Sequence, residues 1–405
     1  MDKRIDEISR RRWIGRGLAY AALGGTLGAC GGGGGGGGDG SGGDDGPVVP
    51  PAQPQLPPIV ADTLPRLRGT SVLPDTDWAV ATSSRWTHIE ELPSAGANAV
   101  RLFLQPFSFA DGASLLPGQS LAQAIAESMK QWGAMVDWCL SRKVYVILAI
   151  NLEISYPAYG VWPSDGRSLW KDASAQDEFV AAWTALATQY AGRAGIVFDL
   201  LNEPHGITDD EIAGNHALPK SVWNALHLRT LNAVRAIDPA RWLIVEPVWG
   251  DAANFADLST NGDAKTIYSF HYYGPHYFTH QGVSGWPAAG TVHYPGVTQD
   301  ASWQAPATWD KTRIAAEMKP AEDFGRAHGV RVMLGEFGSS RGAPAAERAA
   351  WTADVLAVAD AAGHDLVYFQ YDGWGVATDF TQGWAFENSP VEPLLQAQFA
   401  RNKVS

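Results

Sequence analysis

The chain has 405 residues, 45 % of them hydrophobic, which is enough for one large domain or two ordinary ones. Its formal net charge of −13 argues against a nucleic-acid partner. The 17 tryptophans are far above ordinary usage, and their flat faces suit sugar rings. We expect Trp132, Trp183 and Trp223, which lie in helical stretches, to pack in the hydrophobic core instead.

Residues 1–29 have the pattern of a bacterial export signal, with a basic start and an apolar stretch too short to span a membrane comfortably. The segment ends in a Leu-Gly-Ala-Cys sequence that resembles a lipobox, so we expect cleavage before Cys30 and attachment of a lipid to its sulfur. That lipid would anchor the protein to the membrane of the cell envelope, on the periplasmic side or at the cell surface. The alternative is an ordinary secretory signal with an incidental cysteine. Ser9-Arg10-Arg11 also resembles a twin-arginine signal, which leaves the export route open.

Residues 30–60 run from polyglycine through a Gly/Ser/Asp segment to a proline-rich one. This segment has almost no apolar side chains to offset the entropy of ordering, so we predict a disordered linker. No second linker and no break in composition follow, and residues 61–405 are therefore predicted to form a single domain.

Eight short apolar runs follow the linker, at residues 67–72, 97–104, 144–150, 196–201, 242–248, 266–272, 330–334 and 365–371. The segments between them include stretches with apolar residues at helical spacing, at residues 121–140, 176–190, 221–237, 312–328 and 345–361. A strand followed by a helix, repeated about eight times, predicts a (β/α)₈ TIM barrel. A doubly wound open sheet is the alternative, but no glycine-rich phosphate turn supports it.

Two of these runs end in a glutamate. The apolar run of residues 195–201 leads into Asn202-Glu203-Pro204, and because proline cannot donate to a sheet ladder, we expect the strand to stop at Glu203. A second run leads into Glu336. Parallel α/β folds keep their chemistry at the carboxyl ends of the strands, so two carboxylates at matching positions indicate a working pair.

The carboxyl ends of a barrel's strands meet on one face, where further polar and aromatic side chains are expected to converge with the two glutamates. They are Arg101, Asn151, Glu153, Asn202, Glu246, Trp249, His271, Tyr273, Gln370, Tyr371, Asp372 and Trp374. We expect Arg101 to hold Glu336 ionised, with a buried salt-bridge network lacking any chemistry as the alternative for this arginine. Asn202 is placed to bind a sugar 2-hydroxyl, and His271 and Tyr273 could orient the carboxylates.

Two carboxyls that flank a cleft are suited to splitting an acetal. One must stay protonated to donate to the leaving oxygen, and the other must be ionised to attack the anomeric carbon or stabilise its charge. His271, His276 and His280 would be the candidates for a zinc site, but no His-Glu-x-x-His pattern accompanies them, so we expect no metal and no cofactor.

Four motifs in order resemble glycoside hydrolase family five, the cellulase family of clan A. They are residues 97–101, Asn202-Glu203-Pro204, residues 269–281 and Leu334-Gly335-Glu336-Phe337-Gly338, and the similarity covers roughly residues 67–395. The resemblance implies a TIM barrel and a retaining mechanism on β-linked polysaccharides, with Glu203 as acid/base and Glu336 as nucleophile. We further expect a monomer.

Two departures from the family pattern lie at sugar-binding positions. Many members carry a histidine at the end of the third strand, where this chain has Asn151, and many have a tryptophan within the eighth strand, for which Trp374 or Tyr371 would substitute. We therefore expect an endo-β-1,4-glucanase, with β-mannanase and exo-β-1,3-glucosidase as alternatives. A carbohydrate-binding surface lipoprotein without catalysis is the alternative from another class.

Overall fold

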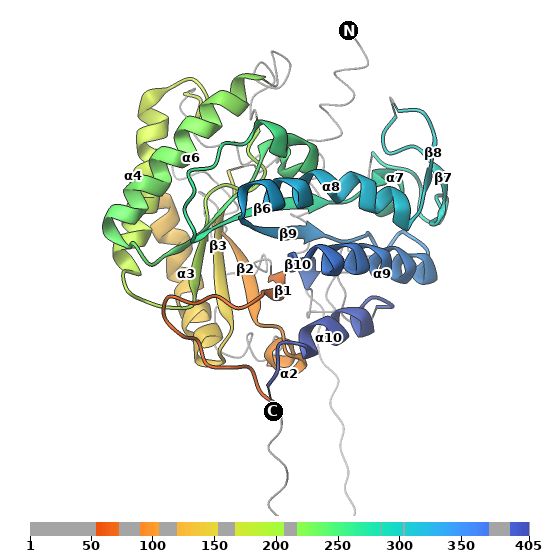
Figure 1. Ribbon diagram of the computed structural model, residues 1–405, viewed down its shortest axis with the longest axis horizontal. Helices are drawn as coiled ribbons and strands as arrows, with labels where there is room; N and C mark the ends of the chain where they lie inside the picture. Colours follow the sequence, from red (N-terminus) through yellow and green to blue (C-terminus); the bar gives the residue numbers. More distant parts are fainter. Residues whose placement is uncertain are drawn as a thin grey trace, which may run out of the picture.

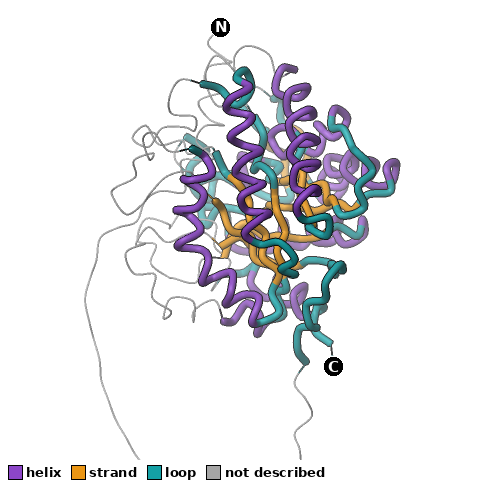
Figure 2. Tube along the Cα trace, turned by 90° about the vertical axis from the view of Figure 1, so that its left-hand side faces the viewer, coloured by secondary structure: helices purple, strands orange, loops and turns teal. Residues whose placement is uncertain are grey.

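The computed structural model describes residues 54–72, 90–104, 120–152, 167–205, 217–283, 285–302, 304–371 and 389–404. The strands gather at the centre of the molecule and the helices surround them (Figure 1, Figure 2). The predicted export signal, Cys30 and most of the predicted linker lie outside the described residues. Among the helices that are described, none is both long and apolar enough to cross a membrane.

Eight parallel strands close into a barrel in the order β1, β10, β9, β6, β5, β4, β3, β2. Their bounds are β1 Arg68–Val72, β2 Ala99–Leu104, β3 Tyr145–Ile150, β4 Ile196–Asp199, β5 Trp242–Val245, β6 Thr266–Tyr272, β9 Arg331–Phe337 and β10 Asp365–Tyr371. Each predicted apolar run overlaps one of these strands, and β9 extends three residues beyond the predicted run of residues 330–334. The (β/α)₈ barrel is thus confirmed, and the closed order of strands rules out the doubly wound open sheet.

Helices cover the outside of the barrel. The five predicted helical segments correspond to α3 (Leu121–Ser141), α4 (Ala173–Gln189), α6 (Ala217–Ile237), α8 (Lys311–His328) and α9 (Ala345–Ala362), and the shorter α2 (Glu91–Ala95) and α10 (Glu392–Ala400) add to them. Local sequence sets their ends. Ser120 and Gln123 form a capping box at the start of α3, and α8 stops at Gly329, whose left-handed φ of 65° favours glycine.

The inside of the barrel is layered because alternate residues of a strand point to the same face. In β2, Ala99 belongs to an apolar inner layer and Phe103 to a small aromatic cluster, with the inward-facing Arg101 between them. In β4, Val197 belongs to the same apolar layer as Ala99, and Asp199 follows two residues later. A charged layer therefore lies directly above an apolar one.

Buried tryptophans of the surrounding helices hold the strand ends. Each donates its indole N–H to a backbone carbonyl at or just beyond a strand's carboxyl end, at distances of 2.8–3.0 Å: Trp132 to Phe103, Trp183 to Leu200, Trp223 to Glu246 and Trp351 to Gly274. The predicted core role of Trp132, Trp183 and Trp223 is confirmed, since all three are buried. These bonds fix the face of the barrel that carries the two glutamates.

Two connections on that face have structure of their own. The segment after β5 forms the short helices η4 (Val248–Gly250) and η5 (Ala252–Asp257). The long connection after β6 contains α7 (His276–Thr279) and an antiparallel hairpin of β7 (Gly296–Thr298) and β8 (Ala307–Trp309). Most of the long connection after β3 lies outside the described residues.

Candidate active site

The chain leaves strand β4 earlier than the sequence predicts. The strand ends at Asp199, not at Glu203, and Glu203 has a φ of 43°. The N–H of Asn202 donates to the carbonyl of Ile150 (2.8 Å), and the N–H of Glu203 donates to Oε2 of Glu246 (2.8 Å). Pro204 prevents the strand from continuing past Glu203, but the strand already ends four residues earlier. The N–H of Glu203 donates to the side chain of Glu246 instead of to a neighbouring strand.

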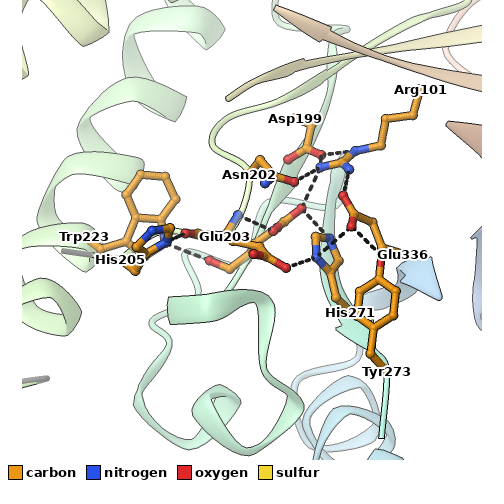
Figure 3. A network of polar contacts seen from close by, with 10 residues as sticks. Arg101, Asp199, Asn202, Glu203, His205, Trp223, His271, Tyr273 and Glu336 are labelled. Atoms are coloured by element: carbon orange, nitrogen blue, oxygen red, sulfur yellow. Dashed lines mark hydrogen bonds and ion pairs between the residues drawn. The ribbon is translucent and has the colours of Figure 1, made fainter. Parts of the chain in front are cut away.

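The carboxyls of Glu203 and Glu336 both lie beside the imidazole of His271 (Figure 3). One carboxylate oxygen of each lies within 4.8 Å of the other, and a ring nitrogen of His271 lies within the same distance of both. Glu336 belongs to β9 and Glu203 follows β4, so residues far apart in the sequence are brought together by barrel closure.

Arg101 joins the nucleophile candidate to the buried charges below it. Its Nη1 donates to Oε1 of Glu336 (2.5 Å), and Nη2 donates to Oε1 of Glu246 (3.0 Å) and Oδ1 of Asn202 (3.0 Å). Nε donates to Oδ2 of Asp199 (2.8 Å). Arg101 is therefore part of a buried salt-bridge network and also contacts Glu336 directly.

His271 links Glu203 to the same network. Its Nδ1 lies 2.8 Å from Oε1 of Glu203, and its Nε2 lies 3.1 Å from Oε1 of Glu246. Gly250 makes room for the ring, because a Cβ at this position, where φ is +61°, would lie 3.1 Å from the imidazole. The imidazole is thus held between two carboxyls, with 3 % of its side chain exposed.

Tyr273 completes the contacts of Glu336. Its hydroxyl donates to Oε2 of Glu336 (2.8 Å), so each oxygen of this carboxylate accepts a hydrogen bond, one from Arg101 and one from Tyr273. The plane of the Glu336 carboxylate is fixed from two sides.

A pocket of about 390 Å³ opens beside this group. Its lining joins Glu203 and His271 to the connections after β5 and β6 and to α8, and it includes Trp249, Tyr273, Trp286, Asp300 and Glu317. Glu203 therefore borders the pocket, whereas Glu336 is absent from its lining.

The chain matches the family described as Cellulase (glycosyl hydrolase family 5) over residues 62–375, which is well over half of its length. The chain belongs to glycosyl hydrolase family 5. It is accordingly a glycoside hydrolase, and its membership of the family supports a β-glycan as substrate.

Several curated relatives of this family 5 hydrolase are named as endoglucanases. Endoglucanase C of Acetivibrio thermocellus is 26 % identical over 293 residues, which are 67 % of this chain and 78 % of the relative. Endoglucanase B of Clostridium cellulovorans is 22 % identical over 275 residues, 65 % of this chain and 56 % of the relative. Among solved structures, endoglucanase Cel5A of Thermotoga maritima has a TM-score of 0.58 at 22 % identity, covering 82 % of this chain and 96 % of that one, and so shares the fold.

Burial and neighbouring charges shift the pKa values of Glu203 and Glu246 in opposite directions. Burial raises the pKa of Glu203, although its hydrogen bond from His271 opposes the rise. Burial would also raise the pKa of Glu246, but His271 and Arg101 lower it below the ordinary value. For His271, burial alone would lower the pKa, whereas Glu246 and Glu336 raise it well above the ordinary value. These directions favour a protonated Glu203 beside a charged imidazolium.

The remaining predicted site residues differ in whether they line the pocket, are buried elsewhere or lie outside the described residues. Asn151 is buried at the end of β3, and Trp249 lines the pocket with its ring stacked on His205 at a centroid distance of 3.9 Å. Tyr371 is buried in the layer between sheet and helices, and its hydroxyl donates to Glu91 of α2. This hydrogen bond lies outside the network that joins Glu203, His271 and Glu336. Trp374, Glu153 and Asp372 lie outside the described residues.

One member of the network, Asp199, is absent from the predicted site residues. Glu246 is among the predicted strand-end residues without a role, and the structure shows its three contacts, to Arg101, His271 and the N–H of Glu203. Asp199 was overlooked inside an apolar run. A charged residue in such a run needs a buried partner of opposite sign, and this signal would have pointed to the arginine in β2.

Glu203, His271 and Glu336 are also the one group among the described residues whose ligand atoms are close enough to share a metal ion. The positive guanidinium of Arg101, 2.5 Å from Glu336, would repel a divalent cation there. The hydrogen bonds to His271 and Glu336 already engage the same atoms. This arrangement suits acid–base and nucleophilic chemistry better than metal coordination.

Proposed function

We propose that this family 5 enzyme is a retaining endo-β-1,4-glucanase in which Glu203 is the acid/base and Glu336 the nucleophile. The observation that carries the proposal is the approach of one carboxylate oxygen of Glu203 to within 4.8 Å of one of Glu336. Retaining glycosidases place their carboxyls about 5–5.5 Å apart, and inverting ones about 6.5–9.5 Å. The choice of β-1,4-glucan is supported by the relatives named as endoglucanases.

In the first step, an oxygen of Glu336 attacks the anomeric carbon while Glu203 gives its proton to the glycosidic oxygen. The bond to the leaving sugar breaks as the bond to Glu336 forms, which yields a glycosyl-enzyme ester and a free sugar hydroxyl. Burial favours the protonated form of Glu203 that this step requires. Arg101 and Tyr273 keep the Glu336 carboxylate in position for the attack.

In the second step, water takes the place of the departed sugar. Glu203, now ionised, accepts a proton from this water as its oxygen attacks the anomeric carbon, and the bond to Glu336 breaks. The product keeps the configuration of the substrate, and both glutamates return to their starting states. His271, 2.8 Å from Glu203, stabilises the ionised carboxylate between the two steps.

Asn202 and the pocket favour particular places for the substrate. Oδ1 of Asn202 accepts from Arg101, so the N–H groups of the amide are the part of this side chain that can donate to the 2-hydroxyl of the sugar that reacts. The pocket borders the acid Glu203 and not the nucleophile Glu336, so it suits the sugar units on the leaving side of the bond. Trp249 and Trp286 supply aromatic surface along it.

Purified protein tested on β-1,4-glucan, β-mannan and laminarin decides the proposal. An endo-glucanase lowers the viscosity of soluble cellulose faster than it releases reducing ends, and proton NMR of the first product shows the β-anomer. Main activity on mannan or laminarin would replace the substrate assignment, and the α-anomer would exclude retention. Glu336→Gln should abolish turnover without unfolding the protein, because the two side chains are nearly isosteric.

Glu203→Ala separates the two roles. Loss of the acid should lower hydrolysis of glucan by about 10²–10⁴-fold, whereas an aryl glycoside whose leaving group needs no protonation should still form the intermediate. If wild-type protein binds glucan but hydrolyses none of the polysaccharides, the alternative of a carbohydrate-binding lipoprotein without catalysis holds.

We further propose that Cys30 carries a lipid that anchors the enzyme to the cell envelope, with residues 30–60 as a flexible tether. The support is the sequence of residues 1–30 alone. Incorporation of labelled fatty acid into the wild type but not into Cys30→Ser would support the anchor. A mature protein found free of lipid would favour the ordinary secretory signal.

A further inference from the structure

Asp199 has an unusual set of contacts beneath the catalytic pair. Its side chain is 1 % exposed, and Oδ2 accepts a hydrogen bond from Nε of Arg101 (2.8 Å) and forms an ion pair with Nη2 at 2.7 Å. Its other oxygen, Oδ1, is buried without a hydrogen-bond partner in the part of the chain that the structure describes. A buried carboxylate oxygen without a donor is costly.

The charges around Asp199 do not balance if every group is ionised. Two cationic side chains and four carboxyls share the site: Arg101, His271, Asp199, Glu203, Glu246 and Glu336. Full ionisation would bury a net charge of −2, and the proton that Glu203 needs for catalysis would still leave −1. One further proton makes the buried group neutral, which removes a large desolvation cost.

The contacts identify the carboxyl that can take this proton most easily. Glu246 accepts from Arg101, His271 and a backbone N–H, and both oxygens of Glu336 accept donors. A proton on either would displace a hydrogen bond. A proton on Oδ1 of Asp199 displaces none, since the hydrogen bond and the ion-pair contact from Arg101 both go to Oδ2.

We infer that Asp199 is a positioning residue that holds a proton on Oδ1 while Glu203 holds the catalytic one, so that the network beneath the two glutamates is neutral. The inference rests on the proposed roles of Glu203 and Glu336. With Asp199 uncharged, the positive charge of Arg101 is shared between the two other acidic side chains that it contacts, Glu246 and Glu336.

The electrostatic surroundings agree with this assignment. Burial raises the pKa of Asp199 to about 7, and Glu246 adds to the rise, although Arg101 and His271 oppose it. These groups approach Asp199 from β2, from the segment after β5 and from β6, and Glu336 of β9 lies on the far side of Arg101. Above neutral pH, an ionised Asp199 would compete with Glu336 for the guanidinium.

Infrared spectroscopy can detect the proton directly, without relying on activity. At about pH 6, carboxyls of ordinary pKa are ionised and give no carboxylic acid C=O band. We expect wild-type enzyme to show such a band, to shift part of it when aspartate is labelled with ¹³C, and to lose that part at about pH 9. Absence of any ¹³C-aspartate-sensitive band at about pH 6 would overturn the inference.

Two variants assign the band. Asp199→Asn should remove the aspartate-sensitive part, and Glu203→Gln should leave it in place. The matched control is Asp365→Asn, because Asp365 is also buried and paired with an arginine, yet both its oxygens accept donors, from Leu67 and Arg331. Asp365→Asn should keep the band. A band that survives in Asp199→Asn belongs to another aspartate and contradicts the assignment.

Kinetics at about pH 6 test whether Arg101 needs a charge or only an acceptor at this position. Asp199→Asn keeps an acceptor for Arg101, and Asp199→Ala does not, so we expect the alanine variant to lose roughly tenfold more in kcat than the asparagine variant. Equal losses would mean that the negative charge itself is needed, against the inference. Full activity of Glu336→Gln would overturn the proposed function, whereas the infrared result on Asp199 would stand independently.

Discussion

Nη1 of Arg101 lies 2.5 Å from Oε1 of Glu336, and the same guanidinium is fixed from below by Asp199 and Glu246. The residue that orients the proposed nucleophile is therefore also the residue that neutralises the buried charges of the barrel. Stability and catalysis therefore depend on one side chain here.

Arg101→Lys should cost both stability and activity. An ammonium group has no planar fork, so it cannot reach Asp199, Glu246, Asn202 and Glu336 together, and buried carboxylates would lose their partner. Breaking such a buried pair costs about 3–5 kcal/mol, and kcat should fall about 10²-fold or more as Glu336 loses its orientation. Urea unfolding and steady-state kinetics measure the two effects.

The control for this prediction is Arg326→Lys, because Arg326 pairs with Glu322 on the exposed side of α8. The control should change the free energy of unfolding by less than about 0.5 kcal/mol. Wild-type stability in Arg101→Lys would contradict the role of the guanidinium in the buried network.

Tyr273→Phe should lower kcat while the fold stays intact. The substitution removes only the hydroxyl that donates to Oε2 of Glu336 at 2.8 Å, and the ring keeps its place beside Phe369. A hydrogen bond to a charged group contributes about 1.5–3 kcal/mol, which corresponds to a roughly ten- to hundredfold loss of kcat. Circular dichroism should be unchanged, and an unaltered kcat would show that Arg101 alone positions the carboxylate.

Glu203→Gln should stabilise the enzyme at neutral pH. Folding raises the pKa of Glu203 above its ordinary value of 4.5 because the side chain is buried. The folded state then binds more protons than the unfolded one between 4.5 and the raised pKa, so wild-type stability falls as pH rises through this window. Glutamine does not titrate and escapes the loss, which is about 1.4 kcal/mol for each unit of the rise.

Unfolding by urea at several pH values tests this prediction. The advantage of Glu203→Gln should grow from about pH 4 to about pH 8 and vanish below the ordinary pKa, where both proteins are uncharged at this position. Glu127→Gln, at an exposed residue paired with Lys130, is the control and should show no such trend. An advantage that does not change with pH would point to packing and not to ionisation.

The fold and the catalytic pair could be predicted because both depend on local patterns. Apolar runs marked the eight strands, and Glu203 and Glu336 each follow or end such a run. Partners were harder to predict, since Arg101 reaches Asp199 across 98 positions and Glu336 across 235. Tyr371 lies at the end of a strand as predicted, but its position alone does not tell whether the side chain points into the barrel or toward the helices. In the structure its hydroxyl donates to Glu91.

The pocket wall was equally out of reach of the sequence. Trp286 lies in the long connection after β6, and its ring comes to the pocket because it packs on His276 and His280, at centroid distances of 6.1 and 4.7 Å. His276 is in turn held by Asp300, 2.8 Å from its Nδ1. Such a chain of contacts within a connection follows no periodic pattern that a sequence would reveal.

Trp286→Ala should weaken binding of the sugar units on the leaving side of the bond. The half-buried ring lines the same pocket as Glu203, and Glu336 is not part of that lining, so we expect the ring to contact sugars on the leaving side of the bond. Loss of an aromatic surface against one sugar should raise KM for long cello-oligosaccharides roughly five- to thirtyfold. An aryl glycoside whose leaving group is a single small ring should show little change.

Trp286→Phe should restore much of the affinity. Val297→Ala, at an exposed residue of β7 in the same connection, serves as the control. Equal KM effects on both substrates would place Trp286 at the sugar that reacts and would reverse the orientation of the substrate in the pocket.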